Sequence, residues 1–376
     1  MRLLYLHNAP VPSTAANAVQ VASMCSAFEA AGMPTVLVRP SGPGGSIEEI
    51  VSQYDLATGF AVRSVFMPKI PAREILYAAS AILRYGSKGD VVYTRSVSVA
   101  TVAGVLGLPF VLEMHIPASG MRSRLTRRLG RVIASPRFVK MVTISASLRD
   151  DYERHFPLLR GRIIVAHDGA APAPDAIEPV PLYGEFRVGY IGHLYPGKGM
   201  EIIAPLAKLC PEATFHIVGG TPADLDIWRG RLSSSNVVFH GHVPHRQAKA
   251  YLAGMHVVLA PYMRVVRGVG GGANLADWMS PLKMFEYMAQ GKAIIASDLP
   301  VLREVLRDGE NALLCDPDDP AAWASALKGL AGQSAKLAEL GECAQSDFLN
   351  SYSWDQRAKR ILDAIEAGTR QSGRMT

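Results

Sequence analysis

Long apolar segments are missing from this chain of 376 residues. No stretch approaches the roughly 18 uncharged apolar residues that a membrane-spanning helix needs. The apolar run near the N-terminus ends at Leu6, which is too early for the core of a signal peptide. We therefore expect a cytoplasmic protein, and we expect any membrane contact to be peripheral, on the inner face of the membrane.

Cysteine and nucleic-acid motifs are scarce as well. The four cysteines show no metal-binding spacing, so we expect reduced thiols and no bound metal. The chain has no helix-turn-helix, zinc or RNA-binding motif and no basic stripe interleaved with exposed aromatics, which argues against a nucleic-acid partner. The net charge of +6 instead suits a phosphate-bearing ligand or an anionic surface.

What the chain does contain is a regular alternation of short apolar runs with amphipathic stretches of helical length. This alternation is typical of β-α-β units and a parallel sheet, and the length fits two domains. The predicted strands of the first half are residues 3–6, 35–38, 91–94, 110–114, 141–144 and 163–166. Those of the second half are residues 187–191, 214–218, 237–239, 257–260, 293–297 and 312–315.

A proline-rich segment without periodicity, residues 171–185, reads as a linker between the two halves. It divides the chain into a first domain of residues 1–170 and a second domain of residues 186–353. The last stretch begins at Trp354 and has apolar residues at helical spacing. We expect a C-terminal helix, residues 354–376, that joins the first domain.

Two segments of the second half carry the strongest chemical signal. The first is a glycine-rich turn between a strand and a helix, which contains Gly197, Lys198 and Gly199. Such a turn brings backbone N–H groups and a helix N-terminus close to a phosphate, and Lys198 adds a full positive charge. The alternative is an ordinary strand–helix turn with a solvated lysine, because glycine loops are common.

The second segment is a helix predicted over residues 281–290, with Ser280 as N-cap, Pro281 as first residue and Gly291 as left-handed stop. Lys283 then lies in the first turn, where the helix dipole disfavours a cation unless an anion is bound. Glu286 is a carboxylate among apolar neighbours and needs a partner. That partner is either a pair of ribose hydroxyls or an arginine of the same domain.

These two segments resemble the donor site of the retaining family 4 glycosyltransferases, which have the GT-B fold. Lys198-Gly199 is similar to the phosphate motif of that family, and residues 285–289 with 291–292 are similar to the second half of its paired-glutamate motif. The likeness covers most of the chain, with further family landmarks at residues 93–96, 113–115, 165–169, 217–220, 241–243 and 260–262.

The resemblance implies an α/β protein of two Rossmann-like domains whose parallel sheets face a central cleft. It implies transfer of a sugar from a nucleotide-sugar to a lipid-linked or polysaccharide-type acceptor, with retention of configuration and with neither metal nor cofactor. The first domain would bind the acceptor and the second the donor. The donor-binding residues implied are His193, Lys198, Gly199, His242, Val243, Ser280, Pro281, Leu282, Lys283 and Glu286.

In the first domain the resemblance assigns the reaction centre to His115, together with Glu113. Asn17 and Gln20 are expected near the acceptor if the helix that follows the first strand points its N-terminus there. The alternative for Asn17 is a plain helix cap.

The sequence departs from the family at two positions of the donor site. His193 stands where the family usually has its first phosphate-binding arginine. Trp278 stands where the first glutamate of the paired motif would fall, so the usual contact to the donor sugar is in doubt.

Other functions remain open from the sequence. A sugar-nucleotide epimerase shares the GT-B fold, and a degenerate transferase would bind a nucleotide without turnover. Residues 122–140 hold arginines and a lysine but no acid, with Arg124, Arg127, Arg128 and Arg131 opposite a narrow apolar face. This run is either a solvated helix face or a patch that rests on anionic lipid.

Overall fold

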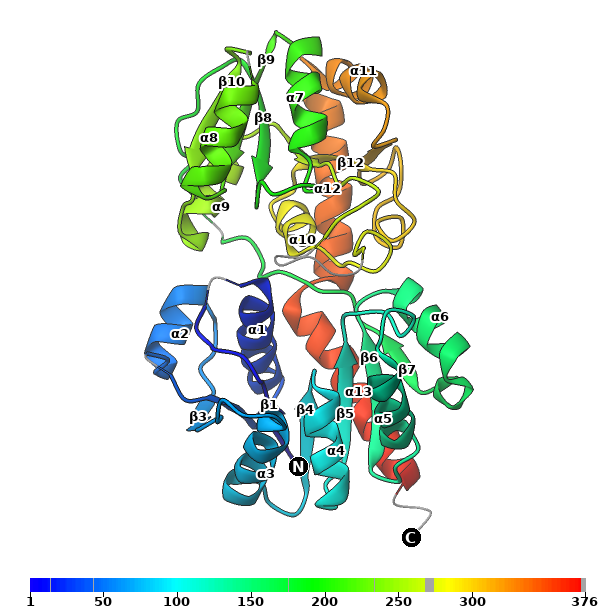
Figure 1. The fold of residues 1–376 in the computed structure, drawn as a ribbon. Coiled ribbons are helices and arrows are strands. Elements are labelled where there is room, and N and C mark those ends of the chain that lie inside the picture. Colours follow the sequence, from blue (N-terminus) through cyan, green and yellow to red (C-terminus); the bar gives the residue numbers. More distant parts are fainter. Residues whose placement is uncertain (14, 43, 175, 233, 268–273, 373–376) are drawn as a thin grey trace. The chain divides into compact units, whose positions relative to one another are not determined.

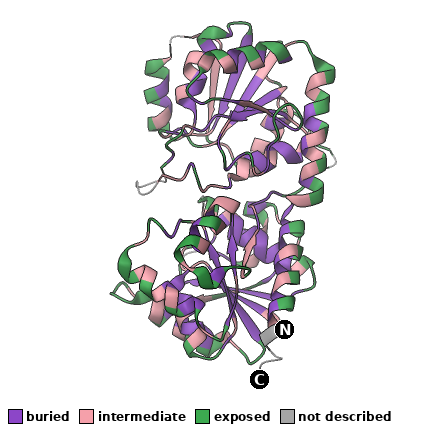
Figure 2. Cartoon of the chain, turned by 90° about the vertical axis from the view of Figure 1, so that its right-hand side faces the viewer, coloured by how far each residue is buried: buried purple, intermediate pink, exposed green. Residues whose placement is uncertain are grey.

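The computed structural model describes residues 1–376 except 14, 43, 175, 233, 268–273 and 373–376. The chain divides into two compact units (Figure 1). Unit 1 comprises Met1–Asp168 together with Trp354–Thr376, and unit 2 comprises Gly169–Ser353. In both units the central strands are largely buried and the outer faces of the helices are exposed (Figure 2).

Unit 1 contains a parallel sheet of seven strands in the order β3-β2-β1-β4-β5-β6-β7. The inner strands are nearly continuous apolar runs, because helices cover both faces of the sheet. The strands are β1 (Arg2–Leu6), β2 (Thr35–Pro40), β3 (Ala61–Val65), β4 (Asp90–Thr94), β5 (Phe110–Met114), β6 (Phe138–Thr143) and β7 (Ile163–Val165).

Strand β3 has no counterpart among the strands predicted from the sequence. It lies at the edge of the sheet, where only β2 pairs with it. Its side chains alternate between exposed and partly buried positions, and only Val65 is fully buried. An edge strand of this kind lacks the apolar run that reveals a central strand.

The helices of unit 1 form two layers. In one layer α1 packs against α13, and α13 packs on β6. In the other layer α4 contacts both α3 and α5. The C-terminal segment therefore returns to unit 1 as a helix. The helices are α1 (Ala16–Ala30), α2 (Ile47–Tyr54), α3 (Arg73–Tyr85), α4 (Val97–Val105), α5 (Ser123–Ile133), α6 (Ala146–His155), the 3-10 turn η1 (Pro157–Leu159) and α13 (Trp354–Ser372).

Unit 2 repeats the architecture with six parallel strands in the order β10-β9-β8-β11-β12-β13. The strands are β8 (Phe186–Ile191), β9 (Ala213–Val218), β10 (Val237–Gly241), β11 (Val257–Ala260), β12 (Ala293–Ser297) and β13 (Leu313–Cys315). The helices are α7 (Met200–Leu209), α8 (Pro222–Arg231), α9 (His245–Ala253), α10 (Leu282–Ala289), α11 (Pro320–Leu330) and α12 (Ser334–Ser351).

Alternate residues of the central strands feed two apolar cores, one on each face of this sheet. Val258 and Ile294 pack with α10 and α12, whereas Leu259 and Ile295 pack with α7 and α11. This is the period-two alternation of a strand that is buried on both faces. Each unit thus has a core of its own.

Helix α10 starts later than the sequence predicted. Pro281, with ψ of 120°, is the N-cap and Leu282 the first helical residue, so the prediction of a Ser280 cap is wrong. Proline is tolerated at this position because the first residues of a helix do not use their N–H groups in helical hydrogen bonds. The carbonyl oxygen of Pro281 accepts a hydrogen bond from the N–H of Met284. At the other end Gly291 has φ of 60°, the predicted left-handed stop.

The strand order reverses once in each sheet, between β1 and β4 in unit 1 and between β8 and β11 in unit 2. In doubly wound sheets, ligands bind beyond the carboxyl ends of the strands at this switch point. No helix of the described residues is long and apolar enough to cross a membrane.

Candidate functional site

The first polar cluster lies at the switch point of unit 2, where a glycine-rich loop leads from β8 into α7. Gly199 caps the helix with φ of 116°, and a Cβ atom there would lie 2.3 Å from the carbonyl oxygen of Pro261. A side chain is excluded for steric reasons as well as conformational ones. The N–H groups of Gly197 and Gly199 donate to the carboxylate of Glu201, at 3.0 and 3.4 Å. Part of the predicted phosphate cradle is thus occupied by the protein itself.

Two ammonium groups gather above this loop. Lys198 Nζ lies 5.3 Å and Lys283 Nζ 4.6 Å from the centre of the Tyr262 ring, and Lys283 Nζ is 3.9 Å from that of Tyr190. Among the described residues neither lysine has a carboxylate within salt-bridge distance, and the buried Nζ of Lys283 has no hydrogen-bond partner. Aromatic faces stabilise such cations only in part.

The surroundings penalise the charged form of both lysines. Burial lowers the pKa of Lys198 from its ordinary value to about 8. Burial, and then repulsion from Lys198, lowers the pKa of Lys283 well below the ordinary lysine range. A bound anion would reverse both effects, because an opposite charge within a few ångströms favours the ammonium form.

Two further predicted donor residues lie near the lysines. Burial and the charges of Lys198 and Lys283 lower the pKa of His193, and His242, just beyond β10, adds to the same effect. His193 therefore acts as a neutral hydrogen-bonding group unless an anion binds beside it. Val243, the next residue, is partly buried against the apolar core that contains α10.

Glu286 lies one turn into α10 and faces a histidine. His245 Nδ1, at the start of α9, is 3.8 Å from Glu286 Oε1, so the arginine partner considered from the sequence is absent among the described residues. About a third of each side chain is exposed. At this distance the contact is weak, and the carboxylate retains acceptor capacity for a ligand.

The second polar cluster lies at the switch point of unit 1, around Glu113. This carboxylate is fully buried and accepts hydrogen bonds from four side chains. Gln20 Nε2 donates at 2.7 Å, Arg357 Nη2 at 3.0 Å and His115 Nε2 at 2.5 Å, and the Tyr93 hydroxyl donates to the second oxygen. A carboxylate with so many donors is held rigidly and has no free face for a substrate.

Arg357, on α13, is the counter-ion of this cluster. It is 1% exposed, and its Nε donates to the carbonyl of His167 at 2.9 Å while Nη2 lies 3.8 Å from Asp168. Burial alone would raise the pKa of Glu113, but Arg357 and then His115 hold it well below the ordinary range. Burial raises the pKa of Asp168, and His115 and Arg357 reduce that rise.

His115 follows β5 and is partly exposed. Burial and the positive charge of Arg95 lower its pKa, although Glu113 opposes the shift. A neutral imidazole that lies 2.5 Å from an ionised carboxylate carries its proton on that nitrogen, Nε2. Nδ1 of His115 is then the acceptor nitrogen, so Glu113 and Arg357 determine the tautomer of His115.

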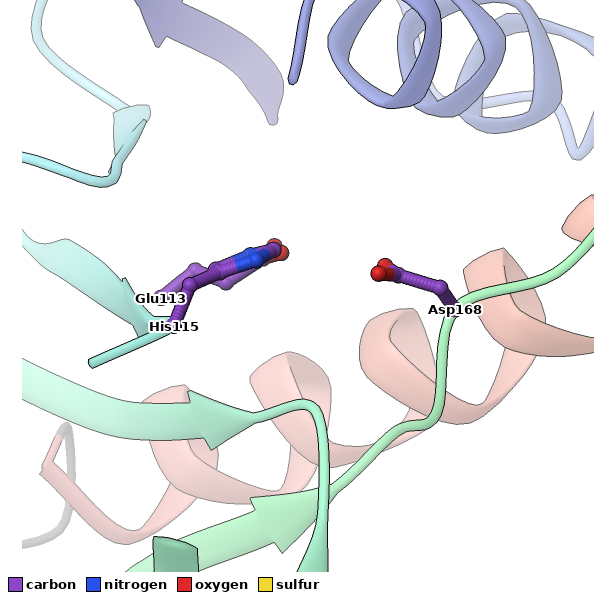
Figure 3. Close-up of side chains that lie close together, drawn as sticks. All are labelled: Glu113, His115 and Asp168. Carbon is purple, nitrogen blue, oxygen red and sulfur yellow. The ribbon is translucent and has the colours of Figure 1, made fainter. Parts of the chain in front are cut away.

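Glu113, His115 and Asp168 point toward one another, and their donor atoms all lie within 4.8 Å (Figure 3). Three such donors are a set that a metal ion could use. Here, however, the guanidinium of Arg357 already supplies positive charge to both carboxylates. The charge balance is that of an ion-pair network with a histidine at its edge.

Gln20 and Asn17, the two residues expected near the acceptor, lie in different environments. Gln20 is buried in the Glu113 cluster, and its amide oxygen accepts from Arg95 at 3.3 Å. Asn17 is the second residue of α1, whose N-cap is Ala15, and among the described residues its side chain has no hydrogen-bond partner. The alternative that Asn17 caps the helix is therefore wrong.

The basic helix predicted in the first half is α5. Arg124, Arg127 and Arg131 are exposed, while Leu129, Val132 and Ile133 are buried. Arg128 differs from the sequence expectation, because it is partly buried and donates to Ser98 of α4 at 3.1 Å. No acid of the described residues pairs with the three exposed arginines.

Two Rossmann-like units with parallel sheets, each with a polar cluster at its switch point, define the GT-B class of α/β proteins. HepE of Anabaena, solved in complex with UDP, aligns with a TM-score of 0.72 and 16% identity, over 98% of this chain and 100% of that one. Sucrose-phosphate synthase of Thermosynechococcus elongatus aligns with a TM-score of 0.71 and 16% identity over all of both chains.

Residues 185–333 of this chain match the model of the group 1 glycosyl transferases. Phosphatidyl-myo-inositol mannosyltransferase of Mycolicibacterium smegmatis is 30% identical over 177 residues, 46% of this chain and 42% of that protein. D-inositol 3-phosphate glycosyltransferase of Streptomyces avermitilis is 24% identical over 304 residues, 69% of this chain and 61% of that protein. The matches thus span about half of these relatives.

Proposed function

We propose that this protein is a retaining glycosyltransferase that moves a sugar from a nucleotide-sugar to a lipid-linked or polysaccharide-type acceptor. The observation that carries the proposal is the pair of ammonium groups of Lys198 and Lys283. Both flank one tyrosine ring, and neither has a carboxylate partner in the described part of the chain. A diphosphate supplies the missing negative charge, and the switch point is where nucleotides bind in such sheets.

In the proposed reaction the bond between the sugar C1 and the phosphate oxygen breaks, and a bond from C1 to the acceptor oxygen forms on the same face. The acceptor proton passes to the leaving phosphate. Lys198 and Lys283 stabilise the charge that develops on that phosphate, as oxyanion-type stabilisation requires. Glu286 accepts hydrogen bonds from the ribose.

Unit 1 contributes the acceptor side of the proposed reaction. His115 touches the reacting groups through Nδ1, and Glu113 acts through His115 as a positioning residue. Because Arg357 neutralises Glu113 and Asp168, we propose that no resident metal takes part. Treatment with EDTA is then expected to leave the rate of transfer unchanged.

The names of the relatives support both acceptor classes. One set acts on phosphatidyl-myo-inositol or inositol 3-phosphate, and glycogen synthase of Mycobacterium tuberculosis is 26% identical over 243 residues. For a lipid-linked acceptor we place the enzyme in the cytoplasm, at the inner face of the membrane, with the exposed arginines of α5 on anionic headgroups.

The test is a thermal-shift screen with UDP, GDP and ADP and their sugars, followed by transfer of radiolabelled sugar from the donor that binds. A ligand at 100 times its dissociation constant stabilises by about 2.7 kcal/mol. Lys198→Ala and Lys283→Ala should each weaken donor binding by about 1.5–3 kcal/mol, whereas Lys208→Ala, exposed on α7, should not. Equal donor affinity in all variants would overturn the donor site.

The same assay addresses the missing first glutamate of the paired motif. Donor binding without release or transfer of the sugar would identify a degenerate transferase, in which Trp278 has replaced a required carboxylate. Transfer with retention identifies an active enzyme. Interconversion of the nucleotide-sugar without an acceptor would identify an epimerase.

A further inference from the structure

A row of polar side chains crosses the switch point of unit 1, and the proposed reaction does not use all of it. In the register of the sheet Leu6 pairs with Thr94 and Thr94 with Leu112. The next residues therefore share one row at the carboxyl edge of the sheet: His7 and Arg95 directly follow β1 and β4, and Glu113 is the penultimate residue of β5. Side chains of one row point to the same face of a sheet, here the face of Gln20 and Arg357.

His7 is the anomaly of this row. Its side chain is 3% exposed, and both of its ring nitrogens lack a hydrogen-bond partner among the described residues. Buried polar groups are nearly always hydrogen-bonded, because an unsatisfied one loses its bonds to water without a replacement. A fold that retains an imidazole here at such a cost points to a ligand that satisfies it.

Arg95 beside it is a cation without an acid. Its one described hydrogen bond reaches the amide oxygen of Gln20 at 3.3 Å, and no carboxylate of the described residues lies within salt-bridge distance. Glu113 is saturated by four donors, and Asp168 faces Arg357. The remaining N–H groups of the Arg95 guanidinium are available to oxygen atoms of a ligand.

We propose that His7 and Arg95 form a subsite for a phosphate group carried by the acceptor. The guanidinium fork binds two phosphate oxygens and the imidazole N–H donates to a third, which satisfies both side chains at once. This inference rests on the proposed function, since it names a feature of the acceptor that reaches His115. The phosphate neutralises the positive charge of Arg95, and it accepts from the neutral imidazole of His7.

The choice of an anion over a neutral sugar follows from charge. A sugar hydroxyl would satisfy the imidazole but would leave the charge of Arg95 without compensation in a half-buried place. A single water molecule fails for the same reason. A carboxylate carries a full charge but offers only two oxygens, whereas a phosphate ester offers three terminal oxygens, two for the guanidinium fork and one for the imidazole.

The test measures inorganic phosphate binding to the full chain by calorimetry, at constant ionic strength, in a Lys198→Met/Lys283→Met background that removes the cations of unit 2. Phosphate should bind, and Arg95→Gln should weaken it about tenfold to a hundredfold, the value of a charge-assisted hydrogen bond. His7→Leu should weaken it similarly. Arg137→Gln, a change at an exposed arginine of the same unit, is the control and should bind as the background does.

Stability gives a second measurement with the opposite sign. Because the His7 nitrogens have no hydrogen-bond partner among the residues that the structure describes, His7→Leu should unfold at the same or a higher urea concentration than the parent. Phosphate should then stabilise the parent and not the variant. A background that binds no phosphate at millimolar concentration, or variants that bind it equally well, would overturn the proposal.

The source of the phosphate is resolved by two probes. Glycerol 3-phosphate represents a soluble ester, and vesicles that contain phosphatidic acid represent a lipid headgroup. Preference for either one, lost in Arg95→Gln, supports the subsite and assigns its source. In transfer assays Arg95→Gln should raise KM for the acceptor and leave UDP binding unchanged. A parent that binds none of UDP, GDP and ADP would instead contradict only the proposed function.

Discussion

The polar clusters of units 1 and 2 occupy equivalent places in two similar folds, yet they treat charge in opposite ways. The negative charge of Glu113 is compensated within unit 1, by Arg357 and by three neutral hydrogen-bond donors. Around Lys283 two positive charges face aromatic rings and each other. The first arrangement holds its side chains in fixed orientations. The second leaves positive charge that a bound anion would compensate.

The comparison teaches how a fold divides labour between two sites. An internally balanced network holds His115 in one tautomer whether or not a ligand is present. A cluster of uncompensated charges destabilises the ligand-free fold, and a bound anion relieves that destabilisation. The relief contributes to the affinity for the anion. Replacement of one charge of the Glu113–Arg357 pair should therefore destabilise unit 1. Replacement of the Lys283 charge should stabilise ligand-free unit 2.

The largest effect is expected for Arg357→Met. It leaves Glu113 buried with its charge uncompensated, and breaking a buried pair in this way costs about 3–5 kcal/mol. Urea unfolding followed by circular dichroism measures the loss, with Lys359→Met, an exposed change on the same helix, as control. The double variant Glu113→Gln/Arg357→Met should recover part of the loss. Equal stability of Arg357→Met and the parent would show that the network is not the support of unit 1.

The opposite sign is expected for Lys283→Met in the absence of ligand. The change keeps the apolar stem and removes an ammonium group that has no hydrogen-bond partner among the described residues. The free energy of unfolding should therefore rise by about 1–3 kcal/mol. Tryptophan fluorescence during urea unfolding reports on it, because Trp228 and Trp323 lie in the core of unit 2. A clear loss of stability would mean that the lysine is satisfied by its aromatic neighbours.

A smaller effect is expected for Glu286→Gln, which keeps the shape of the side chain and removes its charge. Affinity for the donor and for the free nucleoside diphosphate should fall together, by about 1–1.5 kcal/mol, because both carry the ribose. Gln247→Glu, at an exposed position of α9, is a control for surface charge. Normal nucleotide affinity combined with lost transfer would assign Glu286 to the sugar instead.

The smallest effects per residue are expected on α5. Arg124→Gln, Arg127→Gln and Arg131→Gln should each weaken sedimentation with phosphatidylglycerol vesicles by about 1 kcal/mol at low salt. Arg128 is left in place because it bonds Ser98. Nucleotide affinity should not change. Vesicle binding by the triple variant equal to that of the parent would make α5 a solvated face.

Sequence patterns reveal most of the fold because alternation of apolar runs is a local property. They also indicate Lys198, Lys283, Gln20 and His115, which sit beside strand ends and helix starts. Arg357 escaped attention because its partner Glu113 is 244 positions away, and nothing local in an amphipathic helix marks one arginine as buried.

The role of His7 was equally hidden in the sequence. It follows an apolar strand and looks like any residue at a strand end, and only its burial without partners distinguishes it. Glu201 was missed for a related reason, because a carboxylate in a first helical turn is common and its bond to the glycine loop depends on the backbone path. Pairs of residues far apart in the sequence, and buried groups without hydrogen-bond partners, are recognised only in the three-dimensional structure.

The central claim, that unit 2 holds uncompensated lysines for a diphosphate, is tested most directly by proton uptake on nucleotide binding. The pKa of Lys198 is about 8 in the ligand-free chain, and that of Lys283 is also lowered. At pH 8.5 a good part of Lys198 is therefore neutral, and a diphosphate that favours the ammonium form raises the pKa of both lysines. By the same linkage the stability of the ligand-free chain should rise with pH above about 8, because unfolded lysines bind more protons there.

The measurement is calorimetric titration with UDP at pH 8.5, or with GDP or ADP if the screen selects them, in two buffers of different ionisation enthalpy. We predict net uptake of protons by the parent and a smaller uptake in Lys198→Met and in Lys283→Met. Tight binding without proton uptake, or with proton release, would contradict the account, because the lysines would then already be charged and compensated before the nucleotide arrives.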